Sequence, residues 1–138
     1  MSPAWRKVLI VEDDMHLRFF LHTVFESGGY ATETARNGRE GVDKARREKP
    51  DLISLDLMMP RQGGVNMYRE LKSDPELQDI PVIILSGVEA KAFDHALRML
   101  NVSRAGELPQ PEAYLEKPPV PERVLQEAER ILRDRGKQ

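Results

Sequence analysis

Charged side chains at the ends of short apolar segments constrain the fold of this chain more than any other feature. Glu12 and Asp13 follow residues 7–11, Asp56 ends residues 51–56, and Lys117 follows residues 113–116. Short apolar runs of this kind are typical of buried strands. In a parallel sheet covered by helices on both faces, ligands bind at the carboxyl ends of the strands. We therefore expect these side chains to meet at one edge of a sheet.

Three carboxylates and a lysine at one edge indicate a site for a cation and a phosphoryl group. The carboxylates would repel one another unless a hard cation neutralised them. Mg²⁺, or Mn²⁺ in its place, suits this role because it prefers a few carboxylate oxygens together with water and phosphate oxygens. The lysine adds a positive point charge for a phosphoryl oxygen. These residue types indicate phosphoryl transfer onto a carboxylate.

Predicted strands and helices alternate along the chain. Strands are expected at residues 7–11, 30–35, 51–56, 81–86 and 113–116. Helices are expected at residues 15–27, 38–48, 65–73, 90–100 and from 121 onward, with Asp14 and Asn37 as N-caps and with Phe20 and Val65 facing inward. The short connections imply an α/β protein with a doubly wound parallel sheet, in which the second strand lies near an edge.

Length and composition restrict the function classes. The 138 residues are expected to form one domain, residues 1–138. A net charge of −2 argues against general nucleic-acid or membrane-surface binding, and the absence of cysteine excludes thiol chemistry. No apolar run approaches the ~20 residues of a membrane span, and the N-terminus lacks the apolar segment of a signal peptide. We expect a cytoplasmic protein with no nucleic-acid or membrane partner.

Several short motifs, in this order, resemble the receiver domain of two-component response regulators. They are Val11-Glu12-Asp13-Asp14, Asp56-Leu57-Met58-Met59-Pro60 with Gly64, Ser86-Gly87, and Lys117-Pro118. The resemblance covers about residues 7–132. It implies a flavodoxin-like fold, with five parallel strands in the order 2-1-3-4-5 and five helices. It also implies a role in phosphorelay signal transduction.

The resemblance assigns a role to each residue of the acidic site. Asp56 would be the phospho-acceptor, a carboxylate nucleophile that attacks a phosphohistidine of a partner histidine kinase. Asp13, Asp56 and the backbone carbonyl of Met58 would bind Mg²⁺ directly, and Glu12 would act through water. Lys117 would neutralise charge during a transfer that needs positioning more than proton chemistry.

The resemblance also implies a conformational switch. Ser86 would hydrogen-bond a phosphoryl oxygen after transfer, and its movement would draw Tyr114 from an outward to an inward position. Such a switch is a segment with two conformations, whose equilibrium is shifted by the added dianionic phosphoryl group. The switch would change the binding of a downstream protein whose identity the sequence does not indicate.

Three features depart from the usual receiver pattern. Residues 101–112 lengthen the connection before the last strand, and connections of this length often have a function. Pro119 replaces an aromatic or bulky apolar residue, and Val120 stands where an Asp or Ser would cap the last helix. Pro109 favours an extended path, and Leu108 offers an apolar anchor. We expect this segment to remodel the adjoining face, so that the protein is a monomer or a weak dimer.

Several functions share this chemistry. Because the chain ends soon after the last predicted helix, we expect a stand-alone receiver, not an enzyme, that binds a partner when phosphorylated. One alternative is a phosphorelay intermediate that passes its phosphoryl group to a histidine phosphotransfer protein. Another is a Mg²⁺-dependent phosphohydrolase with an aspartyl-phosphate intermediate, although such enzymes carry a second Asp where this chain has Met58. A scaffold without phosphorylation is disfavoured by the intact acidic set.

Overall fold

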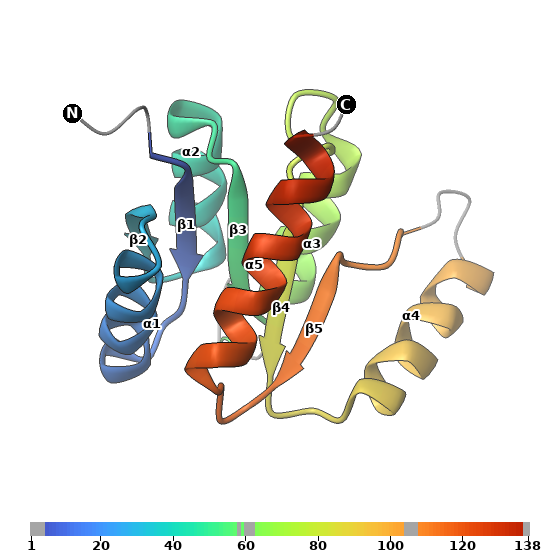
Figure 1. Cartoon of the computed structure of the whole chain (residues 1–138). Coiled ribbons are helices and arrows are strands. Elements are labelled where there is room, and N and C mark those ends of the chain that lie inside the picture. Colours follow the sequence, from blue (N-terminus) through green and yellow to red (C-terminus); the bar gives the residue numbers. More distant parts are fainter. Residues whose placement is uncertain (1–4, 58, 60–62, 104–107, 137–138) are drawn as a thin grey trace.

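A five-stranded parallel sheet lies between two layers of helices (Figure 1). The computed structural model describes residues 5–57, 59, 63–103 and 108–136. The strands within these ranges are β1 (Lys7–Val11), β2 (Ala31–Ala35), β3 (Leu52–Asp56), β4 (Val82–Ser86) and β5 (Ala113–Glu116). The helices are α1 (Met15–Ser27), α2 (Gly38–Glu48), α3 (Gly64–Ser73), α4 (Ala90–Ser103) and α5 (Pro121–Gly136).

The strand order β2-β1-β3-β4-β5 confirms the predicted flavodoxin-like topology. Every neighbouring pair is parallel, with Val11 beside Leu55 and Asp56 beside Leu85. The register brings the carboxyl ends of β1, β3, β4 and β5 to the same edge of the sheet. The edge strand β2 carries Thr and Glu among its residues, whereas β3 and β4 are buried throughout.

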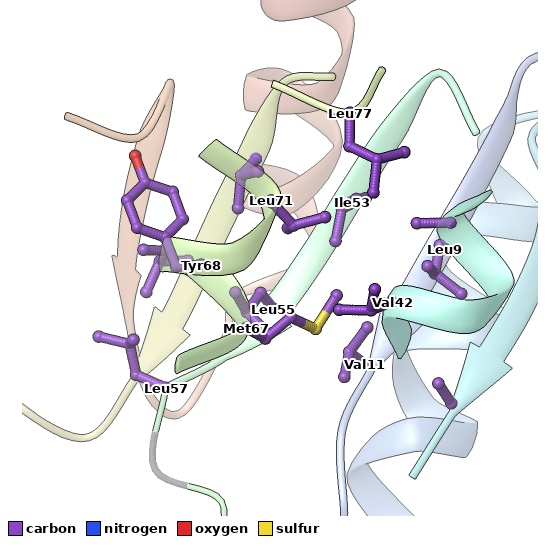
Figure 2. Packing of buried hydrophobic residues seen from close by; sticks show 14 of the residues in the cluster. Leu9, Val11, Val42, Ile53, Leu55, Leu57, Met67, Tyr68, Leu71 and Leu77 are labelled. Atoms are coloured by element: carbon purple, nitrogen blue, oxygen red, sulfur yellow. The ribbon is translucent and has the colours of Figure 1, made fainter. Parts of the chain in front are cut away.

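The central strands bury side chains on both faces because helices cover both. One cluster packs α1 and α5 against the sheet and includes Leu21, Phe25 and Val124. The other packs α2 and α3 against the opposite face, where Met67 and Tyr68 lie among strand residues (Figure 2). α4 lies beside β5 at the edge of the sheet (Figure 1).

Side-chain caps start two of the helices at the predicted positions. The Asp14 carboxylate accepts hydrogen bonds from the backbone N–H groups of His16 and Leu17, at 2.8 and 3.2 Å. The Asn37 side chain accepts one from the N–H of Glu40, at 2.9 Å. Each cap satisfies donors that have no partner inside the helix. Because Asp14 begins α1 directly after Glu12 and Asp13, its cap also sets the conformation of the acidic turn.

Two residues predicted to face inward are exposed, and one helix is longer than predicted. Phe20 is 37% exposed and Val65 is 40% exposed. Phe20 is the residue before the buried Leu21, and successive residues of an α-helix are rotated by about 100°. The Phe20 side chain is therefore turned toward solvent. Val65 lies in the first turn of α3, whose buried residues are Gly64, Met67, Tyr68 and Leu71, and so falls outside the buried face of the helix. α4 continues to Ser103 instead of stopping at Leu100.

The described part of the lengthened segment is anchored to the body of the domain. Leu108 packs against the cluster under α2 and α3, as predicted for an apolar anchor. The Tyr68 hydroxyl donates a hydrogen bond to the Pro109 carbonyl at 2.6 Å, and the Gln110 amide donates one to Asp94 of α4 at 3.1 Å. Residues 104–107 lie outside the described ranges. Residues 108–110 thus tie α3 to α4.

Gly64 allows α3 to begin against the end of β3. A Cβ atom at this position would overlap the Asp56 carbonyl oxygen and lie 2.6 Å from the Leu57 Cα. Both neighbours are backbone atoms, which cannot rotate away as a flexible side chain can. We expect Gly64→Ala to destabilise the fold by about 1–3 kcal/mol, the usual cost of overpacking, despite the better helix propensity of alanine.

Chemical denaturation of the purified variant measures this effect. Gly87→Ala is the matched control, since a Cβ there meets no heavy atom within 4 Å. The control should remain within about 0.5 kcal/mol of the wild type. Equal stability of the two alanine variants would contradict the close approach at Gly64.

Candidate functional site

The structure brings the predicted acidic residues and Lys117 together at the carboxyl edge of the sheet. Carboxylate oxygens of Glu12, Asp13 and Asp56 lie within 4.8 Å of one another. Glu12 and Asp56 are buried, at 1% and 2% exposure, whereas Asp13 is exposed. Met58, whose carbonyl was predicted as a further ligand, lies outside the described residues. We call this group of carboxylates the acidic pocket, in which Glu12 and Asp56 are the buried members and Asp13 is the exposed one.

The donors of this acidic pocket fit a hard divalent cation. One oxygen of Glu12, Oε2, accepts a hydrogen bond from the Asp14 N–H at 3.2 Å. The other, Oε1, is buried and lies 3.3 Å from Lys117 Nζ, its one cationic contact among the described residues. Two buried carboxylates that share one ammonium group are not fully compensated, and a cation or its bound water would relieve that cost. Three carboxylates with an exposed opening match the preference of Mg²⁺ for a few protein oxygens and several waters.

Lys117 supplies positive charge to the acidic pocket. Its Nζ lies 3.2 Å from Asp56 Oδ1 and 3.3 Å from Glu12 Oε1. Burial acts to lower the pKa of Lys117, but the two carboxylates outweigh it and raise the pKa above the ordinary value. The ammonium group therefore stays protonated and lies beside an Asp56 oxygen.

Glu12 is the carboxylate most affected by its surroundings. Burial and the nearby Asp56 charge raise its pKa to about 7, against the opposing effects of the Asp14 N–H and Lys117. Desolvation disfavours the charged form, and a second carboxylate adds like-charge repulsion. One lysine does not neutralise this pocket, so Glu12 releases its proton less readily than an exposed glutamate.

Ser86 and Tyr114 lie beside the acidic pocket and contact the same turn. Ser86 is buried at the end of β4, and its Oγ accepts a hydrogen bond from the Val88 N–H at 3.0 Å. The half-buried Tyr114 donates its hydroxyl to the Val88 carbonyl at 2.6 Å and stacks on Phe93 with ring centroids 4.7 Å apart. Burial raises the pKa of Tyr114, although the nearby Ser86 hydroxyl acts to lower it. The Tyr114 hydroxyl thus contacts the turn that follows Ser86.

Two residues that the sequence analysis did not single out contact the backbone around the site. Arg18 of α1 donates from Nη1 to the carbonyl oxygens of Glu12 and Asp13, at 2.9 and 3.3 Å. Glu116 of β5 accepts a hydrogen bond from the Ala90 N–H, at the start of α4, at 3.3 Å. The signals in the sequence are a basic residue one turn after the acidic pair and a charged residue at the end of a strand.

No helix within the described residues is long and apolar enough to cross a membrane.

Comparison with known proteins gives one consistent family. Residues 8–128 match the response regulator receiver domain. The polar-differentiation response regulator DivK of Brucella anthropi is 35% identical over 114 residues, which cover 82% of this chain and 85% of that protein. The chemotaxis response regulator CheY4 of Vibrio cholerae is 25% identical, with a TM-score of 0.76, and the match covers 92% of this chain and 98% of that one.

A further solved structure is a receiver domain named as part of a larger protein. It is the signal receiver domain of a signal transduction histidine kinase from Syntrophus aciditrophicus. It is 32% identical, with a TM-score of 0.76, and the match covers 94% of this chain and 91% of that one. These comparisons agree with the family that the sequence motifs indicate.

The raised pKa of Glu12 predicts how stability depends on pH when metal is removed by a chelator. Between the ordinary value of 4.5 and about 7, the folded state holds a proton on Glu12 that the unfolded state releases. The free energy of unfolding therefore falls as pH rises through this window. Glu12→Gln, which cannot titrate, should lose less stability than the wild type over the same range.

Denaturant titrations at several pH values, with a chelator present, measure this difference. Glu122→Gln, in the exposed first turn of α5, is the control and should follow the wild type. Parallel stability curves for the wild type and Glu12→Gln would show that Glu12 does not carry the raised pKa.

Proposed function

Since the chain belongs to the response regulator receiver family, and thus acts as a receiver in two-component signal transduction, we propose that Asp56 is its phospho-acceptor. The observation that carries this proposal is the buried Asp56 carboxylate beside Glu12, Asp13 and Lys117 at the carboxyl edge of the sheet. Asp13, the exposed member of this group, marks the side from which a phosphodonor would approach.

The proposed reaction is a displacement at phosphorus. An Asp56 carboxylate oxygen forms a new bond to the phosphorus of a phosphohistidine, and the P–N bond to the imidazole breaks. The imidazole leaves with the electron pair and takes a proton from solvent, which leaves an acyl phosphate on Asp56. Lys117 lies where it can pair with a phosphoryl oxygen, and such charge neutralisation stabilises a loose transition state.

A divalent cation is part of the proposal. Asp13 and Asp56 would hold it directly, together with the Met58 carbonyl, and Glu12 would act through water. When bound, Mg²⁺ or Mn²⁺ supplies charge neutralisation for the phosphoryl oxygens. The charge balance supports this assignment, because the single ammonium group of Lys117 is shared between the buried Glu12 and Asp56 carboxylates, and the exposed Asp13 lies beside them.

The turn after β4 carries the proposed switch. A phosphoryl group on Asp56 would attract the Ser86 hydroxyl, which now accepts a hydrogen bond from Val88. That change would loosen the turn that Tyr114 contacts through its hydroxyl. The contacts of Tyr114 with Val88 and Phe93 support its role as the residue that relays the change to the outer face.

The proposed partners follow from this chemistry. The phosphodonor is a histidine kinase or a histidine phosphotransfer protein, and the phosphorylated chain binds a downstream protein as a cytoplasmic signalling component rather than an enzyme. Met58 stands where aspartyl-phosphate phosphohydrolases carry a second Asp. The position therefore lacks an acid–base group for rapid turnover, which favours a signalling role.

Phosphorylation by a small donor tests the proposed acceptor. We expect acetyl phosphate and Mg²⁺ to add one phosphoryl group, stable in acid and labile in base, to the wild type. Asp56→Asn should gain none, and a chelator should prevent labelling of the wild type. Intact-mass spectrometry measures the added group.

Asp51→Asn is the matched control for the acceptor. Asp51 is an exposed carboxylate just before the same strand and binds the Lys7 N–H at 2.8 Å. Its variant should be labelled like the wild type. Labelling of Asp56→Asn to the same extent would show that the acceptor lies elsewhere.

The position of residues 108–110 leads to an expectation about the oligomeric state. These residues are hydrogen-bonded to Tyr68 of α3 and to Asp94 of α4. We therefore expect them to reduce the surface beside α4 and β5 that a second subunit could contact. Light scattering should give a monomer or a weak dimer both with and without beryllofluoride, a phosphoryl analogue. A tight dimer induced by beryllofluoride would contradict this expectation.

A further inference from the structure

Arg18 contacts the acidic turn from outside the acidic pocket. The turn comprises the three residues between β1 and α1, Glu12, Asp13 and Asp14. One guanidinium nitrogen of Arg18, Nη1, lies 2.9 Å from the Glu12 carbonyl oxygen and 3.3 Å from the Asp13 carbonyl oxygen. Arg18 itself is half-buried, one helical turn beyond Asp14.

These carbonyl groups lie before the first backbone hydrogen bond of α1. That bond runs from the Arg18 N–H to the Asp14 carbonyl at 2.8 Å. The carbonyl groups of Glu12 and Asp13 thus precede the regular helix and need partners of another kind. The Arg18 side chain provides a charged donor for both, and hydrogen bonds with a charged donor are stronger than neutral ones.

The peptide group between Asp13 and Asp14 is held at both ends. Its carbonyl oxygen accepts from Arg18 at 3.3 Å, and its N–H donates to Glu12 Oε2 at 3.2 Å. Rotation of this peptide plane would break both hydrogen bonds. Because the Asp14 N–H also acts to lower the pKa of Glu12, the same peptide favours the charged form of that carboxylate.

The orientation of this peptide matters most for Asp13. The Asp13 side chain is exposed, so burial does not restrict it, and its direction depends on the backbone that carries it. We propose that Arg18 is a positioning residue that fixes the backbone of the acidic turn, so that Asp13 faces Asp56 and the site binds a divalent cation. This inference rests on the cation site proposed above and adds a residue that does not touch the cation.

The charge of Arg18 and its proposed positioning role predict opposite changes in Mg²⁺ affinity when Arg18 is replaced. A positive charge near a cation site repels the cation, so its removal by Arg18→Gln would, by charge alone, strengthen Mg²⁺ binding. Loss of positioning would weaken binding. Arg18→Lys keeps the charge but replaces the planar guanidinium with a single ammonium group, which does not reproduce its fixed geometry.

A Mg²⁺ titration followed by the amide chemical shifts of labelled protein measures the dissociation constant. We expect both Arg18→Lys and Arg18→Gln to weaken binding about tenfold, the lower end of the effect usual for residues that orient metal ligands. Arg133→Lys is the control, because Arg133 is exposed on α5 and pairs with Glu129 at 3.6 Å. It should bind Mg²⁺ like the wild type.

A melting temperature measured without metal separates positioning from general destabilisation. The proposal is supported if a variant stays folded at the titration temperature but binds Mg²⁺ more weakly than the wild type. Unchanged or tighter binding by Arg18→Gln overturns it.

Hydrogen exchange of the metal-free wild type gives a test that needs no variant. The Asp14 amide should be protected, and rapid exchange there would also overturn the proposal. If the wild type binds no Mg²⁺, the cation site itself fails, which is a different result from equal binding by the wild type and its variants.

Discussion

The burial of two carboxylates side by side is the constraint on which the rest of this structure depends. Glu12 and Asp56 lie almost completely out of solvent, with Asp13 at the opening. Removing carboxylates from water is costly unless each charge is paired. Lys117 contacts both buried groups but brings one positive charge to three acidic residues. Burial, together with the nearby Asp56 charge, raises the pKa of Glu12, and the imbalance leaves a site whose electrostatics favour a cation.

The strand order determines how these groups meet. β1 and β3 are neighbours, which places Glu12 beside Asp56, whereas Lys117 follows β5, on the far side of β4. The long lysine side chain therefore spans the end of β4 to reach Asp56. Ser86 ends β4 and so lies between the lysine strand and the acidic strands. A parallel sheet with this order brings buried carboxylates, a positive charge and a hydroxyl to one edge from residues distant in the sequence.

Much of the fold could be predicted because its signals are local. Apolar runs identify β1, β3 and β4, and Asp14 has the residue type and position of a helix cap. The sequence predicted the charged residues of the site through their places at strand ends. It did not reveal Arg18, because its partners are backbone carbonyl groups, which every residue has. The tie between Tyr68 and Pro109 was missed for the same reason. Such contacts depend on how closely two segments approach, and no periodic pattern records that distance.

The turn after β4 connects the acidic pocket with the outer face of the domain. Side-chain hydrogen bonds help to hold it: Ser86 Oγ accepts from the Val88 N–H, Tyr114 donates to the Val88 carbonyl, and Glu116 accepts from the Ala90 N–H. The first comes from the strand beside Asp56, and the other two come from β5. A shift of the Ser86 hydroxyl toward Asp56 would remove the first bond and leave the turn held by β5. In the proposed switch, the position of the turn would then follow Tyr114 and Glu116, so that β5 would carry a change in charge at Asp56 to the start of α4.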